Sequence, residues 1–168
     1  MIYSPPPQHV DLRYRPSYTE MGDAEMCRRY QDTVEAMIAS REGSEYVRRK
    51  IAQIEFENRL SRLAGLRGNW DTYGSEAPSP EALAAAAAIG EAFINFGLIP
   101  DAVSPSAEGG VAICFVRNQK YADIECFNSG DTLAVRYSSI ENPKAWVVQP
   151  NDVASDATIQ FLTQYLSA

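Results

Sequence analysis

The residues with the clearest chemical potential are Asp123 and Glu125, two carboxylates separated by one residue in the strand-like run YADIECF. Alternate side chains of a strand leave the same face, so the pair could bind a metal ion or act as general acid and base. Metal-dependent nucleases often follow such a pair with a lysine, whereas Cys126 and Phe127 stand here. The pattern favours a solvated strand whose charges discourage pairing at a sheet edge, and a metal-dependent hydrolase is the third functional hypothesis.

The thiols and the histidine give catalysis no further support. The three cysteines, Cys27, Cys114 and Cys126, are widely spaced and odd in number, which is typical of reduced thiols. Cys114 and Cys126 stand among apolar neighbours, without the base or electropositive setting that a reactive thiolate needs. The single histidine, His9, lies in a proline-rich segment. We therefore expect no catalytic residue, no metal site and no cofactor.

A second cluster, GNWDTYG, places Trp70, Asp71 and Tyr73 between two helix-like segments. These three side chains could line a small pocket for a polar ligand, since aromatic and acidic groups together bind cations and sugars. They also suit a structural turn, in which Trp70 covers the end of a core and Asp71 accepts backbone N–H groups. The structural interpretation is favoured, and a small-ligand sensor is the alternative function.

Roughly residues 60–140 resemble a family of small bacterial and phage α+β proteins with an Asn-Trp-Asp-x-Tyr-Gly motif. The residues that carry the resemblance are Asn69, Trp70, Asp71, Tyr73, Gly74 and the helix-starting Ser79. Thr72 stands where the family usually has Gly, which implies a less extreme turn, and the run VAICFV lacks the Glu-Trp pair often found on the family's first strand. The resemblance implies a bacterial, phage or mobile-element protein of the cytoplasm, and no activity, because none is established for the family.

The elements that must position these residues form the order helix, helix, helix, strands, helix. Apolar spacing predicts helices over residues 22–41, 45–66 and 79–96, with a break at Gly43 and Ser44 as the cap of the second helix. A last helix follows a cap at Ser155 or Asp156 and buries Ile159, Leu162 and Leu166. Strand-like runs at VAICFV, YADIECF and TLAVRY are joined by hairpin-length turns, and AWVVQ follows a turn at Asn142-Pro143. We predict an α+β fold, an antiparallel β-meander of three or four strands packed on helices, with an N-terminal helical hairpin extension.

The second predicted helix carries two apolar stripes on different faces. The first contains Val47, Ile51 and Ile54, and the second contains Phe56, Leu60 and Leu63. At about 100° per residue, Val47 and Phe56 point in nearly opposite directions. The two halves therefore have different partners: the first half pairs with the preceding helix or with a second subunit, and the second half packs on a globular body.

The chain is expected to have three parts: a Pro/Tyr-rich extended arm at residues 1–20, a helical hairpin extension at 21–55 and an α+β core at 56–168. Residues 68–168 carry four basic and twelve acidic groups, a net charge of −8, which argues against a nucleic-acid surface on the core. No apolar run is long enough for a membrane span, and the N-terminal residues do not resemble a signal peptide. We expect a cytoplasmic location and no membrane partner.

The leading hypothesis is a non-enzymatic interaction or accessory subunit, for example in a toxin–antitoxin or phage-defence operon. It would bind a protein partner or associate with itself through residues 1–55. The candidate interface residues are Tyr14, Tyr18, Tyr30, Val34, Met37, Val47, Ile51 and Ile54.

Overall fold

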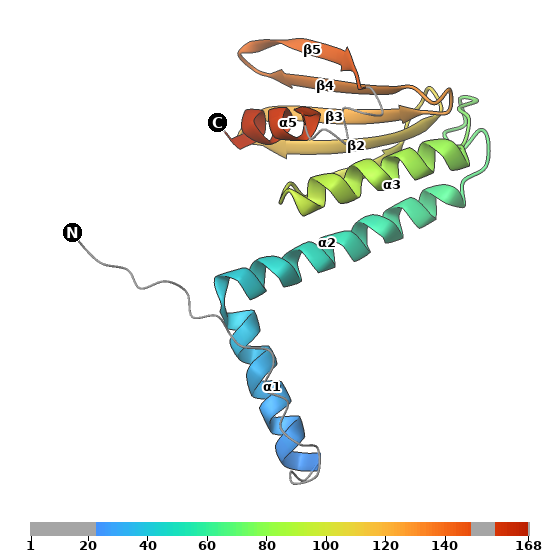
Figure 1. Cartoon of the computed structure of the whole chain (residues 1–168). Helices are drawn as coiled ribbons and strands as arrows, with labels where there is room; N and C mark the ends of the chain where they lie inside the picture. Colours follow the sequence, from blue (N-terminus) through green and yellow to red (C-terminus); the bar gives the residue numbers. More distant parts are fainter. Residues whose placement is uncertain (1–22, 149–156, 168) are drawn as a thin grey trace. The chain divides into compact units, whose positions relative to one another are not determined.

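The computed structural model of the chain describes residues 23–148 and 157–167 (Figure 1). The chain divides into two compact units, Met1–Ser44 and Glu45–Ala168. Residues 45–55 therefore group with the unit that contains the sheet. The predicted arm at residues 1–20 lies outside the described residues, and the predicted pairing of the first two helices as a hairpin stays a prediction.

The first two helices, α1 (Asp23–Ala39) and α2 (Arg41–Ala64), are separated by Ser40. The break predicted at Gly43 is wrong, because Gly43 lies in the first turn of α2 and donates its N–H to Ser40 Oγ (2.9 Å). A serine at a helix N-cap accepts such a bond and satisfies an N–H group that has no partner within the helix. The cap of α2 is therefore Ser40 rather than Ser44.

One antiparallel sheet contains five strands in chain order. They are β1 (Ala102–Pro105), β2 (Gly110–Arg117), β3 (Lys120–Phe127), β4 (Thr132–Ser138) and β5 (Glu141–Val147). The predicted α+β meander is confirmed, with five strands rather than three or four. The turn predicted at Asn142-Pro143 is wrong, because both residues lie inside β5. Proline is tolerated in β1 and β5 because they are the edge strands, where one side of the backbone has no ladder partner.

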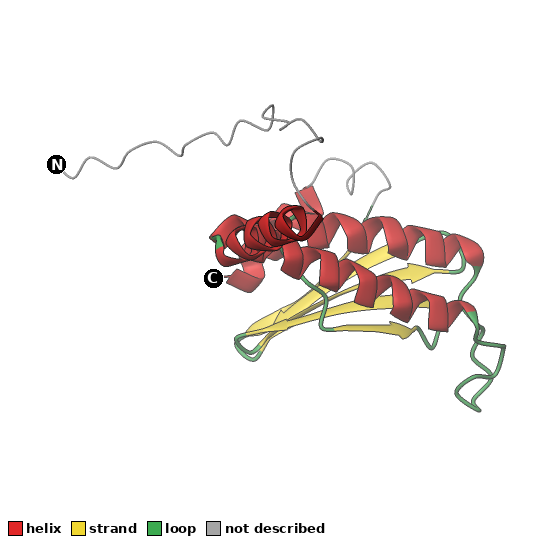
Figure 2. Ribbon diagram, turned by 90° about the horizontal axis from the view of Figure 1, so that it is seen from below, coloured by secondary structure: helices red, strands yellow, loops and turns green. Residues whose placement is uncertain are grey.

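The sheet has two faces with different surroundings. Side chains of one face are buried and pair across β2 and β3: Val111 with Cys126, Ile113 with Ile124, and Phe115 with Ala122. The helices of this unit lie on that side of the sheet (Figure 2). Within the Glu45–Ala168 unit, no described helix covers the opposite face, which we call the open face.

Helices α3 (Pro80–Asn95) and α5 (Ala157–Ser167) cover the buried face. The predicted start of α3 is confirmed: Ser79 Oγ accepts the N–H of Ala82 (3.1 Å), and a proline occupies the first helical turn. The Phe93 ring of α3 packs on Phe115 of β2, with centroids 4.9 Å apart. The apolar stripe predicted for the last helix is buried as expected, at Ile159, Leu162 and Leu166. Its predicted caps, Ser155 and Asp156, lie outside the described residues.

From Glu45 onward, α2 packs against α3 rather than against the sheet. The ring of Phe56 lies against Gly90, where a Cβ atom would approach ring atom Cε2 to 2.6 Å, so only glycine fits. Near the start of this segment, Arg49 Nη1 donates to the carbonyl of Asn95 (3.2 Å) at the end of α3. The space that Gly90 leaves in α3 for Phe56 and the hydrogen bond from Arg49 to Asn95 thus fix which side of α2 faces α3.

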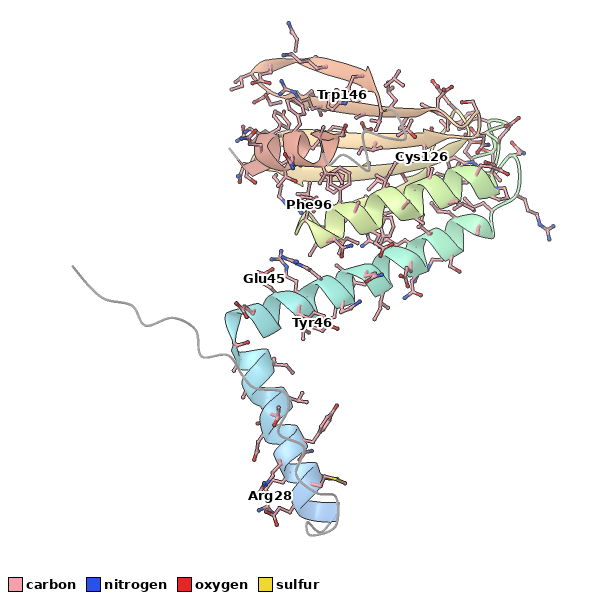
Figure 3. All side chains as sticks on the ribbon, viewed as in Figure 1. Arg28, Glu45, Tyr46, Phe96, Cys126 and Trp146 are labelled. Atoms are coloured by element: carbon pink, nitrogen blue, oxygen red, sulfur yellow. The ribbon has the colours of Figure 1, made fainter. Side chains whose placement is uncertain are left out.

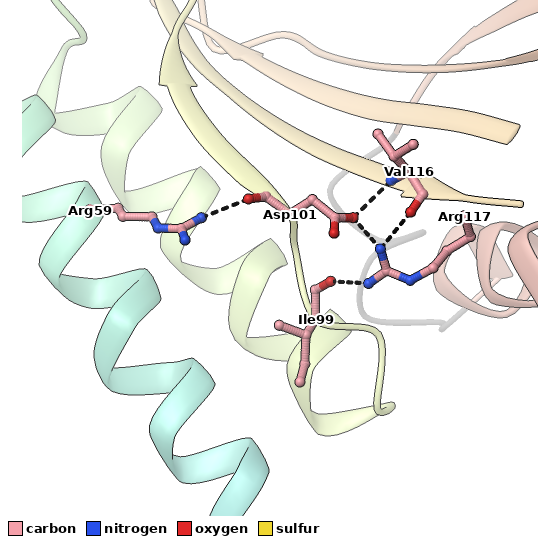
Figure 4. A network of polar contacts seen from close by, with 5 residues as sticks. All are labelled: Arg59, Ile99, Asp101, Val116 and Arg117. Atoms are coloured by element: carbon pink, nitrogen blue, oxygen red, sulfur yellow. Dashed lines mark hydrogen bonds and ion pairs between the residues drawn. The ribbon is translucent and has the colours of Figure 1, made fainter. Parts of the chain in front are cut away.

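A third anchor lies beside β1 (Figure 4). Arg59 Nη1 of α2 donates to the carbonyl of Asp101 (3.0 Å). The carboxylate of Asp101 accepts the N–H of Val116 (2.8 Å) and pairs with Arg117. Arg117 Nη2 also donates to the carbonyl of Ile99 (2.8 Å). The network joins α2, the α3–β1 connection and the end of β2.

Candidate functional site

In the loop between α2 and α3, the carboxylate of Asp71 is the centre of a hydrogen-bonded turn. Its Oδ1 accepts the N–H groups of Tyr73 (2.9 Å) and Ser75 (3.2 Å), and its Oδ2 accepts the Ser75 hydroxyl (2.6 Å). The Ser75 hydroxyl bond, reinforced by the backbone N–H groups, lowers the pKa of Asp71 below its ordinary value. Asn69 Oδ1 accepts the N–H of Gly74 (2.8 Å) in the same turn. Both carboxylate oxygens therefore already have partners within the loop.

The two rings of the cluster have different surroundings. Trp70 is half-buried, and its Nε1–H donates to the carbonyl of Glu76 (3.2 Å). Tyr73 is 92% exposed. The hydrogen bonds of Asp71 agree with the structural turn predicted for it. Trp70 is not part of the core cluster of the described residues, so its predicted role in covering the end of the core stays a prediction. The ligand pocket of Trp70, Asp71 and Tyr73 also stays a prediction.

The turn is unusual at Thr72, whose φ is +66°. The less extreme turn implied by a threonine at this position is not observed, because Thr72 adopts the left-handed conformation that favours glycine. Asn69, with φ +65°, and Gly74, with φ +96°, have the same sign of φ. The bonds made by Asp71 and Asn69 hold the backbone in this shape.

Asn128, at the end of β3, ties the motif loop to the sheet, and the sequence reasoning missed it. Its Oδ1 accepts the N–H of Ser79 (2.7 Å), and its Nδ2 donates to the carbonyl of Ala77 (3.0 Å). Its own N–H donates to the carbonyl of Gly109 (3.1 Å). The Asn128 side chain thus satisfies two backbone groups of the segment before α3, the N–H of Ser79 and the carbonyl of Ala77. The sequence Asn-Ser-Gly-Asp that begins at Asn128 indicates a turn, but Ser79, which Asn128 binds, is 49 residues away in the sequence.

Asp123 and Glu125 lie on the open face, as the alternation predicted, but not at an edge. They belong to β3, the central strand of the sheet, so the expectation that they protect an edge is wrong. The Tyr121 hydroxyl donates to Asp123 Oδ2 (3.0 Å), whereas Asp123 Oδ1 is buried and has no hydrogen-bond partner in the described part of the chain. Burial raises the pKa of Asp123; burial, followed by the charges of Asp123 and Glu108, raises that of Glu125.

The surroundings of this pair contain no obvious third metal ligand. Within residues 23–148 and 157–167, no three Cys, His, Asp or Glu side chains gather closely enough to hold a metal ion. Cys114 is half-buried beside Tyr121, and burial raises the pKa of its thiol. Burial also raises the pKa of Cys126 to about 11, so both thiols are protonated near neutral pH. A hydrolase built on the two carboxylates stays a prediction.

The apolar stripe in the first half of α2 is exposed. Ile51 is 53% exposed and Ile54 is 58% exposed, while Val47 is half-buried. The stripe in the second half is buried, with Phe56, Leu60 and Leu63 all in the core. The switch of faces predicted for this helix is therefore present in the burial pattern. Tyr46, 57% exposed, stands at the start of the same segment (Figure 3).

The other predicted interface residues lie in the Met1–Ser44 unit. Tyr30 of α1 is 72% exposed and Val34 is half-buried. Met26 and Ile38, which are also exposed, follow the same helical spacing along α1. Tyr14, Tyr18 and the side chain of Met37 lie outside the described residues.

A cationic and aromatic cluster at α5 also went unpredicted. The Arg136 guanidinium lies over the rings of Tyr165 (4.4 Å) and Phe161 (5.3 Å) and pairs with Glu141 (2.6 Å). Trp146 meets Phe161 edge to face at 5.4 Å, beside a cavity of about 390 Å³. Because Arg136 already has a carboxylate and two rings as partners, the cluster fastens α5 to β4 and β5. No local signal could have revealed it, since the strand and the helix are distant in sequence.

Comparison with known proteins gives no match: no family model, no curated protein and no solved structure matches the chain. Among the helices of the described residues, none combines the length and the apolar character needed to cross a membrane.

Proposed function

We propose that this chain is a non-enzymatic interaction or accessory protein that binds another protein, or a second copy of itself, through the outer side of α2. The observation that carries the proposal is the exposure of Ile51 and Ile54 on a helix whose opposite side is fully used for packing. Near the middle of the helix, Ala52 and Phe56 are only 6% and 5% exposed. The inner side of α2 packs in the core, and the outer side is the surface we propose for binding.

The described anchors that hold α2 in place lie outside the outer stripe. The inner side is anchored by Arg49, Phe56 and Arg59, none of which depends on Ile51 or Ile54. The exposed half of each isoleucine contributes no burial to the fold, and covering it would contribute about 1 kcal/mol per residue to a complex. Contiguous exposed apolar residues of this kind mark interaction surfaces.

The test replaces the apolar stripe with charge and leaves the inner side of α2 intact. In the double variant Ile51→Glu/Ile54→Glu, we expect loss of association, measured by sedimentation velocity for self-association and by affinity capture from the native host for a partner. Gln160→Glu is the control for added charge and should associate normally, because Gln160 is already polar and is exposed on α5, outside the proposed interface. A full-length protein that is strictly monomeric and captures no partner would refute the proposal, as would a double variant that still associates.

A toxin–antitoxin or phage-defence operon is the setting we propose for this interaction, and it rests on the family resemblance of the Asn-Trp-Asp-x-Tyr-Gly motif. The genes next to this one test it. A toxin or defence nuclease among them supports the setting, and a conserved housekeeping operon would contradict it.

A further inference from the structure

The open face of the sheet is unusually apolar for a surface that no described element of its own unit covers. Open faces of antiparallel sheets are normally polar. Here the register brings together a largely apolar set of side chains from all strands: Ala102, Ser104, Ala112, Cys114, Val116, Tyr121, Phe127, Leu133, Val135, Tyr137, Ala145 and Val147. Of these, Val116, Tyr137 and Val147 are each about half exposed. A contiguous apolar surface of this kind marks an interaction site.

Charge is segregated between the two faces. The four basic residues of β2–β5 pair with one another on the helix side, Arg117 with Lys120 and Arg136 with Lys144. Three of them are already engaged there: Arg117 with Asp101, Lys120 with the carbonyl of Tyr165 (2.8 Å), and Arg136 with Glu141. On the open face, the only charged side chains of these strands are Asp123 and Glu125. The centre of an apolar surface therefore carries two negative charges and no positive one.

The two carboxylates are incompletely satisfied. Asp123 Oδ1 is buried without a hydrogen-bond partner in the described residues, and burial disfavours the charged form of both acids. An uncompensated carboxylate in an apolar setting is costly, and a cation placed against it offsets part of that cost. Next to the pair, the rings of Tyr121 and Tyr137 pack at 5.2 Å and offer a surface on which a guanidinium can stack.

We propose that the open face binds a protein segment that presents an Arg or Lys side chain between apolar or aromatic residues. The cation would lie against Asp123 and Glu125, and its neighbours would cover Val116, Tyr137 and Val147. Charge complementarity selects this occupant. A second copy of the same face would place carboxylates against carboxylates, which like-charge repulsion disfavours. This surface is distinct from the outer side of α2, and the proposal does not depend on that one.

A displayed library of random twelve-residue peptides, selected on the immobilised full-length protein, is the probe. We expect the enriched peptides to carry Arg or Lys flanked by aromatic or aliphatic residues. Fluorescence anisotropy with one labelled enriched peptide should show affinity at least tenfold weaker for Asp123→Asn/Glu125→Gln, and affinity that falls with added salt. The control variant Glu55→Gln/Glu91→Gln removes two exposed acids of the helices α2 and α3 and should bind normally.

Asp123→Asn/Glu125→Gln is expected to fold, because it keeps the shape of both side chains and removes charges that burial disfavours. Equal peptide binding by both variants would overturn the proposal, as would enriched peptides without a basic residue or no enrichment at all. Self-association of the native protein that Val116→Glu abolishes would also overturn it, because a second copy would then be the occupant. Loss of peptide binding in Val116→Glu, with no change in sedimentation, would support it.

Discussion

Replacing Gly90 with alanine tests how α2 is held against α3. A Cβ at this position would overlap three outer ring atoms of Phe56, Cζ, Cε1 and Cε2, with only 2.6 Å even to Cε2. Carbon atoms pack at about 3.5–4.0 Å, so either α2 must retreat or the ring must leave its site. Phe56 is 5% exposed and part of the core, and neither movement is free of cost.

The magnitude follows from two opposing effects. Overpacking a core costs about 1–3 kcal/mol. Alanine in a helix interior gains about 1 kcal/mol over glycine. With three ring atoms in the overlap, we expect a net loss of about 1–2 kcal/mol in the free energy of unfolding for Gly90→Ala.

In the Phe56→Leu background the same substitution should change sign. Leucine ends at its Cδ atoms and lacks the three overlapping ring atoms, so the helix preference alone remains and Gly90→Ala should stabilise by about 1 kcal/mol. Urea denaturation of the native protein, the two single variants and the double variant measures both effects. The coupling should be about 2–3 kcal/mol. Equal effects of Gly90→Ala in both backgrounds would refute the packing described here.

Three further predictions concern the motif loop, its link to the sheet and the acids of the open face. Thr72→Gly should raise the free energy of unfolding by about 0.5–1 kcal/mol, because left-handed backbone is costly for a threonine. Thr72→Ala, which keeps a Cβ, should raise it by less. A glycine variant that urea denaturation shows to be less stable than the native protein would contradict the observed φ. Asn128→Ala should cost about 1–3 kcal/mol, because Ser79 N–H and the carbonyl of Ala77 lose their partner; an unchanged denaturation midpoint would count against this link. Burial raises the pKa of Asp123, so the unfolded carboxyl ionises first and stability falls as pH rises from the unfolded value of about 3.9 through the folded pKa. Asp123→Asn should therefore gain thermal stability over the native protein as pH increases across that range, and a parallel pH profile of the two proteins would be the contrary result.

Local signals in the sequence were sufficient for several elements. Ser79 and the following Pro-Glu predicted the start of α3, because capping depends on adjacent residues only. Helical spacing predicted that α2 changes its apolar face after Ile54, and the exposure of Ile51 and burial of Phe56 agree with this. Alternation on β3 placed Asp123 and Glu125 on one face.

Features that depend on distant parts of the chain were not predictable. The edge strand β1 contains Pro105 and reads as a connector, since its identity depends on pairing with β2. The central position of Asp123 depends on the whole strand order, and so does the desolvation that raises its pKa. Asn128 and Arg136 are ordinary turn and strand residues until the sheet brings them to Ser79 and to α5. In each case the decisive partner lies too far away in sequence for a local pattern to reveal it.

Photo-crosslinking from α2 in living cells tests the proposed function most directly. A photoreactive amino acid at position 54, on the outer side of α2, should give a discrete adduct whose mass identifies a second copy or a partner protein. The same probe at position 131, an exposed turn of the sheet, should not give that adduct, and Ile51→Glu should abolish the one formed at position 54. No adduct at position 54, or one that persists with Ile51→Glu, would contradict an interaction through this surface.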